Sequence, residues 1–87
     1  MPTMQIETLR PVTYRGELVA LAGRNRFHFV APWLSELPDG DITLRFIELL
    51  CTYHREILRG ALPDSRDPER AEQWATLMLG SVPPLPG

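Results

Sequence analysis

Two side chains with reactive groups, Cys51 and His54, lie three residues apart in a segment with helical hydrophobic periodicity. In a helix this spacing places both on one face, where an imidazole base would raise the thiolate fraction of a thiol. The same two residues could begin a metal site, which needs at least one further ligand. A helical wheel, however, places both within the apolar arc, whereas reactive cysteines occupy partly exposed, electropositive surroundings. We therefore expect a buried cysteine and a hydrogen-bonded histidine, in the core or at an interface, with no catalytic residue, metal or cofactor.

The rest of the sequence contains no pattern that favours catalysis. Gly16 and Gly23 do not have the spacing of a phosphate-binding loop. The aspartates fall at expected turns and helix caps, where local backbone hydrogen bonds explain them. Because Cys51 is the only cysteine, an intramolecular disulfide and a multi-cysteine metal centre are excluded. A small enzyme, or a subunit of one, that uses Cys51 and His54 remains an alternative hypothesis.

Basic and aromatic residues interleave over residues 24–29. Such a composition is typical of surfaces that bind single-stranded nucleic acid, but the net charge of the chain is −2, and non-specific binding needs a basic field over the whole contact face. We expect Phe27 and Phe29 to be buried. Arg24 and Arg26 should lie exposed at the end of a hairpin, where they are candidate partner-binding residues. An acidic protein and a nucleic acid are the partners considered, and the nucleic acid is the less favoured.

The first third of the chain, about residues 4–30, is rich in β-branched and aromatic residues and predicts antiparallel strands. Pro11 restricts its strand to a sheet edge, a bulge or a break. Gly16 permits one turn and residues 22–25 another, since glycine and asparagine tolerate positive φ. The segment therefore predicts a small β-hairpin or a three-stranded meander.

A long central helix is predicted over about residues 42–60. Asp41 is a favourable N-cap and Gly60 a favourable stop. The preceding connector, residues 31–40, contains prolines and could hold one helical turn that begins at Pro32.

A shorter helix is predicted over about residues 68–79, with Asp67 as its N-cap. Its core-facing stripe is expected to consist of Ala71, Trp74, Ala75 and Met78. The Pro-rich residues 81–87 predict an extended tail, near polyproline II.

The long helix has an unusually wide apolar surface, because its polar side chains cover only about 100° of arc. We expect Leu44, Leu49 and Tyr53 to form an uncovered strip and to bind a partner. Soluble monomers rarely tolerate an apolar patch of that kind, and two-fold self-association would cover it. The expected partner is a protein, foremost a second copy in a homodimer. The alternative is a compact monomer in which the connector and the Pro-rich tail close over the strip.

Length and composition predict one α+β domain over residues 1–87, with 44% hydrophobic and 23% charged residues. No apolar stretch reaches the ~18 residues of a membrane span, and the first residues lack the pattern of a signal peptide. We therefore expect a cytoplasmic protein with no membrane partner. All nine basic residues are arginines, a bias typical of GC-rich bacterial or phage genomes.

The expected function is that of a small non-enzymatic interaction protein that acts by protein–protein binding. A regulatory, adaptor or inhibitor subunit, including one encoded by a phage or mobile element, fits this size. The alternative binding function is a nucleic-acid-binding regulator that uses the arginine-rich hairpin.

Overall fold

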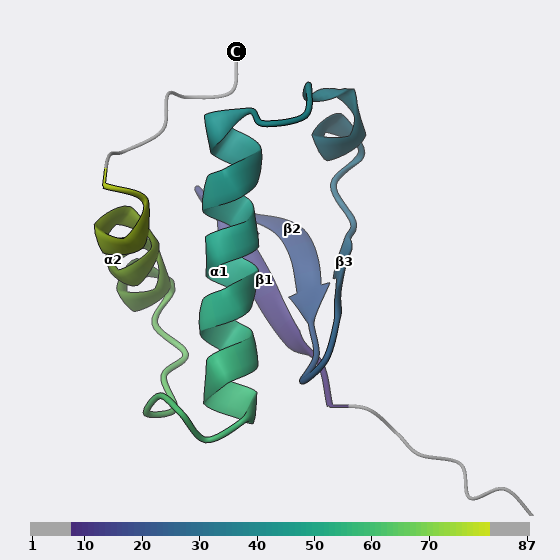
Figure 1. Cartoon of the computed structure of the whole chain (residues 1–87). Coiled ribbons are helices and arrows are strands. Elements are labelled where there is room, and N and C mark those ends of the chain that lie inside the picture. The colour runs from purple at the N-terminus through teal and green to yellow at the C-terminus, as the bar shows by residue number, and fades with distance from the viewer. Residues whose placement is uncertain (1–7, 81–87) are drawn as a thin grey trace, which may run out of the picture.

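A three-stranded antiparallel sheet and two α-helices make up the fold (Figure 1). The structure is a computed structural model that describes residues 8–80. Its strands are β1 (Arg10–Tyr14), β2 (Glu17–Ala22) and β3 (Phe27–Phe29), which pair in the order β1-β2-β3. The α+β class is confirmed, and the sheet is the meander rather than the isolated hairpin. The expected strand start near residue 4 and the Pro-rich tail lie outside the described residues.

The turn between β1 and β2 consists of Arg15 and Gly16, which both have positive φ, 53° and 81°. Two positive φ angles in a two-residue loop are typical of a type I′ turn, whose twist matches that of the flanking strands. Pro11 lies on β1, an edge strand, and the pairing register shifts between Val12 and Thr13. The proline therefore occupies an edge next to an irregularity, as expected.

The long central helix is α1 (Ile42–Leu58). The carboxylate of Asp41 accepts a hydrogen bond of 2.8 Å from the backbone N–H of Thr43, which confirms Asp41 as the N-cap. The helix ends slightly before the expected residue 60, because Gly60 already adopts the left-handed conformation with φ 81°.

The second helix is α2 (Pro68–Leu79). Asp67 caps it by accepting a hydrogen bond of 3.0 Å from the N–H of Glu69, and Gly80 ends it at φ 85°. The connector before α1 contains a 3-10 helix, η1 (Pro32–Glu36), which is the helical turn expected there.

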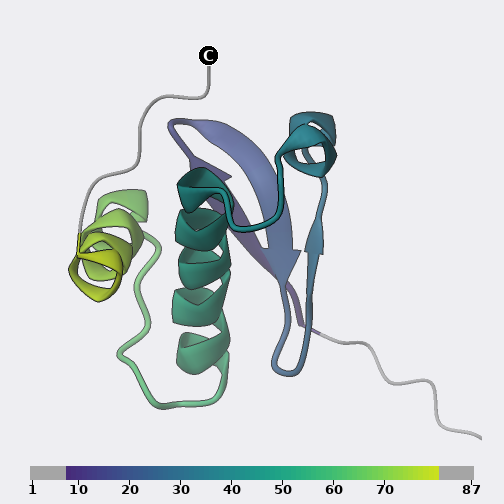
Figure 2. The same cartoon turned by 45° about the horizontal axis from the view of Figure 1, so that its top comes forward.

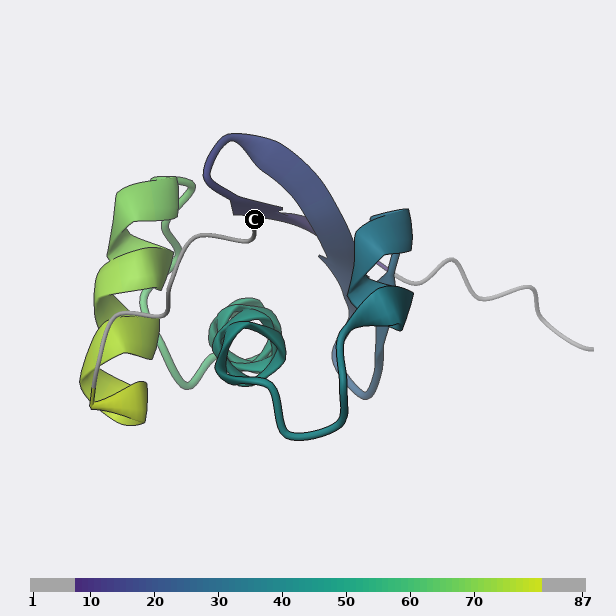
Figure 3. The same ribbon diagram turned by 90° about the horizontal axis from the view of Figure 1, so that it is seen from above.

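Both helices lie on one side of the sheet. α1 packs across β1 and β2, and α2 packs against α1 and β1. Figure 3 shows α1 end-on inside the curve of the sheet and α2 from its side, so the two helices cross steeply. The core between these layers consists of Val12, Tyr14, Val19, Ala20, Ala22, Ala31, Leu34, Phe46, Ile47, Leu50, Cys51, Tyr53, Ile57, Ala71 and Ala75.

The core-facing stripe of α2 differs from the expected one. Ala71 and Ala75 are buried, but Met78 is 59% exposed and Leu79 packs against the core instead. The expectation for Met78 was wrong. α2 packs on the core through Ala71, Ala75 and Leu79, which are spaced by four residues and form one of the ridges by which helices pack. The two alanines in this row allow a close approach to α1.

Candidate functional site

Cys51 is fully buried on the core side of α1. Burial raises the pKa of its thiol to about 12, the charge of Glu48 adds to this shift, and Arg55 opposes it. At neutral pH the thiol is therefore protonated and does not supply the thiolate that nucleophilic attack or metal binding requires. The expected buried position of Cys51 is confirmed.

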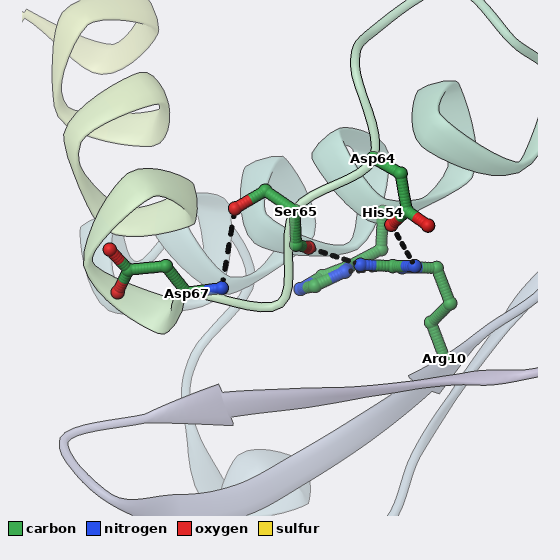
Figure 4. A network of polar contacts seen from close by, with 5 residues as sticks. All are labelled: Arg10, His54, Asp64, Ser65 and Asp67. Atoms are coloured by element: carbon green, nitrogen blue, oxygen red, sulfur yellow. Dashed lines mark hydrogen bonds and ion pairs between the residues drawn. The ribbon is translucent and has the colours of Figure 1, made fainter.

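His54 belongs to a polar cluster that joins three segments of the chain (Figure 4). Nε of Arg10, on β1, donates a hydrogen bond of 3.0 Å to Nδ1 of His54, on α1. Nη1 of the same guanidinium donates to Oδ1 of Asp64 at 2.9 Å, and Nη2 donates to the backbone carbonyl of Ser65. Both acceptors lie in the linker between α1 and α2. The planar fork of donors on arginine suits such a set of separate acceptors.

The imidazole of His54 is held in its neutral form. Burial lowers the pKa of His54 to about 4, and the positive charges of Arg10 and Arg66 act in the same direction. Because Nδ1 accepts the bond from Arg10, the proton of the neutral ring lies on Nε2. The expected hydrogen-bonded core histidine is confirmed, and its ring serves as an acceptor inside the fold.

Arg10 is a buried residue that sequence reasoning missed. Its side chain shares the inner face of β1 with Val12 and Tyr14, and all three are buried. Because side chains alternate between the two faces of a strand, the sequence could have predicted that Arg10 lies on the same face as Val12 and Tyr14. A charged side chain at an inner position needs hydrogen-bonding partners from other segments, and the cluster with His54 provides them.

Leu44, Leu49 and Tyr53 do not form the expected strip. Tyr53 is buried against Trp74 of α2, with ring centroids 5.6 Å apart. Leu44 and Leu49 are half-buried, and their spacing of five residues directs them about 140° apart around the helix. The expectation of an uncovered strip was wrong, because α2 covers one flank of α1. The three side chains therefore do not form one exposed surface, and the homodimer stays a prediction.

Arg24 and Arg26 lie exposed at the turn between β2 and β3, as expected. Arg59 joins this turn to the end of α1: its Nε donates to the carbonyl oxygen of Arg24 at 2.7 Å, and its Nη2 donates to Oδ1 of Asn25 at 3.4 Å. Figure 2 shows the turn beside the last residues of α1. Three arginines therefore gather at this corner, which we call the basic corner (Arg24, Arg26 and Arg59).

β3 is the least covered strand of the sheet. Phe27 is half-buried, whereas Phe29 is 41% and Val30 is 43% exposed. The rings of Phe27 and Phe29 contact each other with centroids 5.7 Å apart. The expectation that both would be buried was wrong, because α1 packs across β1 and β2 while β3 lies at the margin far from α2 (Figure 2).

The face of the sheet opposite the helices also carries apolar side chains. Pro11, Leu21 and His28 form one row of paired residues across the three strands, on the face opposite the buried Arg10. On the same face Leu18 is paired with Thr13 and is 46% exposed. The sheet therefore presents apolar groups both on this face and at its β3 margin.

Within residues 8–80, no group of three or more His, Cys, Asp or Glu side chains could hold a metal ion. No helix in this part of the chain combines the length and the apolarity needed to cross a bilayer. Comparisons with protein-family models, with curated proteins and with solved structures found no match. The function is therefore inferred from the surfaces of the chain itself.

Proposed function

We propose that this protein acts by binding another polypeptide, as a small non-enzymatic regulatory, adaptor or inhibitor subunit in the cytoplasm. The proposal rests on one observation at the margin of the sheet. β3 is an edge strand, and the side chains of its last residue, Phe29, and of the following Val30 are exposed. An open strand edge with neighbouring apolar groups is the feature from which strand-addition interfaces are built. The free thiol of Cys51 agrees with a reducing compartment.

The positions of the reactive groups support binding over catalysis. The thiol of Cys51 is buried and protonated at neutral pH, and Nδ1 of His54 is occupied by Arg10. A catalytic nucleophile or base must instead reach a substrate in a plausible pose. If Cys51 and His54 were catalytic, the core would have to open to bring a substrate into contact with them.

The basic corner favours a second candidate function, that of a nucleic-acid-binding regulator. Against it stand the net charge of −2 and the carboxylate of Glu56, which lies 3.8 Å from Nη1 of Arg59. Salt dependence tests this candidate. Binding to phosphates weakens steeply as salt rises, so the absence of oligonucleotide binding at about 50 mM salt would exclude it.

Site-specific photo-crosslinking in the cells that produce the protein tests the proposed function. A photoreactive amino acid is placed at Leu18 on β2 or at Val30, which directly follows β3, and at Arg45, which is exposed on α1, as the matched control. We expect a polypeptide adduct of defined mass from positions 18 and 30 and none from position 45. The proposal is overturned if no adduct forms, if nuclease digestion removes it, or if position 45 gives the same yield.

A further inference from the structure

The hydrogen bonds between β2 and β3 determine which backbone groups of β3 remain open. The N–H of Val30 donates to the carbonyl of Val19, and the N–H of Gly23 donates to the carbonyl of Arg26, both at 2.8 Å. In an antiparallel ladder, hydrogen-bonded pairs alternate with non-hydrogen-bonded pairs. The residues of β3 between these bonded positions, Phe27 and Phe29, therefore direct their N–H and C=O groups away from β2. Among residues 8–80, no strand lies on that side of β3.

The two edges of the sheet differ in their protection. On β1, Pro11 removes a backbone donor, which is one of the devices that block strand addition at an edge. β3 contains neither a proline nor a charged residue, and Phe29 together with its neighbour Val30 is exposed. The β3 edge is thus the edge that can accept another strand.

The charges around the β3 edge indicate the chemistry of that strand. Residues 23–30 contain two arginines and no acidic residue. The Arg24 side chain is exposed at the turn, and the contact between Arg59 and the carbonyl of Arg24 brings a further guanidinium to the same end. The carboxylate of Glu56 lies 3.8 Å from Nη1 of Arg59 and partly offsets its charge, so Arg24 is the principal cation at this edge. Opposite charges on facing strands are favourable and like charges are unfavourable. A second copy of this chain would bring two such basic edges together, whereas an acidic strand would neutralise one.

We propose that β3 accepts an extended, acidic segment of a partner polypeptide as the fourth strand of the sheet. This inference rests on the proposed function and names the partner chemistry. The open N–H and C=O groups of Phe27 and Phe29 form the new ladder. The side chain of Phe29 contacts the apolar residues of the segment, which lie on one face of it, and its carboxylates lie toward Arg24.

Amide hydrogen exchange, measured by NMR with defined peptides, tests whether an added strand pairs with β3. The probe is a capped octapeptide of alternating valine and glutamate, and the controls are the valine–lysine peptide and a valine–glutamate peptide with alternate N-methylated residues. We expect the acidic peptide to bind saturably and to slow the amide hydrogen exchange of Phe27 and Phe29. Both controls should bind at least about fivefold more weakly, since one reverses the charge and the other removes backbone donors.

Two variants separate the contribution of backbone hydrogen bonds to peptide binding from the contribution of charge. Phe29→Pro removes a donor that faces away from β2 and should abolish peptide binding without removing a ladder bond of the native sheet. Arg24→Glu should weaken binding about three- to tenfold. The matched control is Arg45→Glu, the same change of charge at an exposed position of α1, which should leave the affinity unchanged. Circular dichroism establishes that each variant is folded, and Arg24→Glu remains decisive if Phe29→Pro does not fold.

Several outcomes would overturn the inference. Equal binding of the lysine peptide would exclude the charge argument, and full binding of the N-methylated peptide would exclude the ladder. Amides of Phe27 and Phe29 that become protected with protein concentration alone would identify a second copy as the occupant, and competition by an oligonucleotide would identify a nucleic acid. Adducts from Val30 and Leu18 in cells, together with unprotected β3 amides, would refute this inference while the proposed function stands.

Discussion

Nε of Arg10 lies 3.0 Å from Nδ1 of His54, a residue 44 positions further along the chain. This bond joins the edge strand β1 to the central helix α1, and the same guanidinium also holds the linker to α2 through Asp64 and Ser65. One buried side chain therefore sets the relative position of three segments. Because Arg10 and His54 are both inside the fold, Nδ1 of His54 depends on Arg10 for its hydrogen bond.

Replacement of Arg10 by lysine or alanine should lower the free energy of unfolding by about 1–3 kcal/mol, because Nδ1 of His54 and the carbonyl of Ser65 lose their donor. Lysine does not compensate, since its single ammonium group lacks the fork of donors that arginine has. Urea denaturation measures the change, and Arg45→Ala, at an exposed site, should stay within about 0.5 kcal/mol of the original chain. An Arg10→Lys variant of unchanged stability would contradict the role assigned to this cluster.

The free energy of unfolding should fall as the pH is lowered and His54 takes up a proton. Its pKa is about 4 in the folded chain against an ordinary value of 6.5, so the unfolded chain binds the proton more readily. The stabilisation is therefore fully present above about pH 6.5 and is lost as the pH falls toward 4. The urea midpoint should decrease from pH 7 to pH 4.5, and it should decrease less in His54→Gln, which keeps an acceptor but does not titrate. The same decrease in both proteins would rule out His54 as the cause.

Cys51 should react very slowly with thiol reagents in the native protein. Its raised pKa of about 12 and its complete burial leave little thiolate and no access. At pH 8 the native thiol should react more than about a hundredfold more slowly than the same thiol in urea. A disulfide reagent monitored by absorbance gives both rates, and comparable rates would place Cys51 at an accessible site.

Tyr14→Phe should leave the stability unchanged or raise it by up to about 1 kcal/mol, because removal of an unpaired buried group relieves its desolvation penalty. The hydroxyl of Tyr14 is buried without a hydrogen-bond partner in the described part of the chain. Phenylalanine keeps the ring, which packs on Phe46 with centroids 5.7 Å apart. Thermal denaturation followed by circular dichroism measures the difference, and a marked loss of stability would mean that the hydroxyl has a partner.

Arg24 and Arg26 should be dispensable for folding. Both lie at an exposed turn, where individual charges contribute little to stability, so replacement of both by glutamine should shift the melting temperature by less than about 3 °C. Differential scanning calorimetry provides the test. If the double variant unfolds, the two side chains hold the fold together and their assignment to partner binding fails.

The sequence alone was sufficient to locate the helix starts and the turns. Asp41 and Asp67 cap the helices as expected, and Gly60 and Gly16 take the positive φ angles that were expected of them. Caps and turns depend on hydrogen bonds and backbone angles within a few residues. No knowledge of the remaining chain is needed to predict them.

Tertiary structure alone decided which faces became covered. The steep crossing of α2 over α1 buries Tyr53 and leaves Met78 outside. The position of α1 over β1 and β2 exposes Phe29 at the sheet margin. Local periodicity shows that a strand or helix has two faces, but the partner of each face comes from residues far away in the chain. The strand order within residues 8–80 makes β3 an edge strand, and the side chain of Phe29 beside that edge is exposed because α1 packs on β1 and β2.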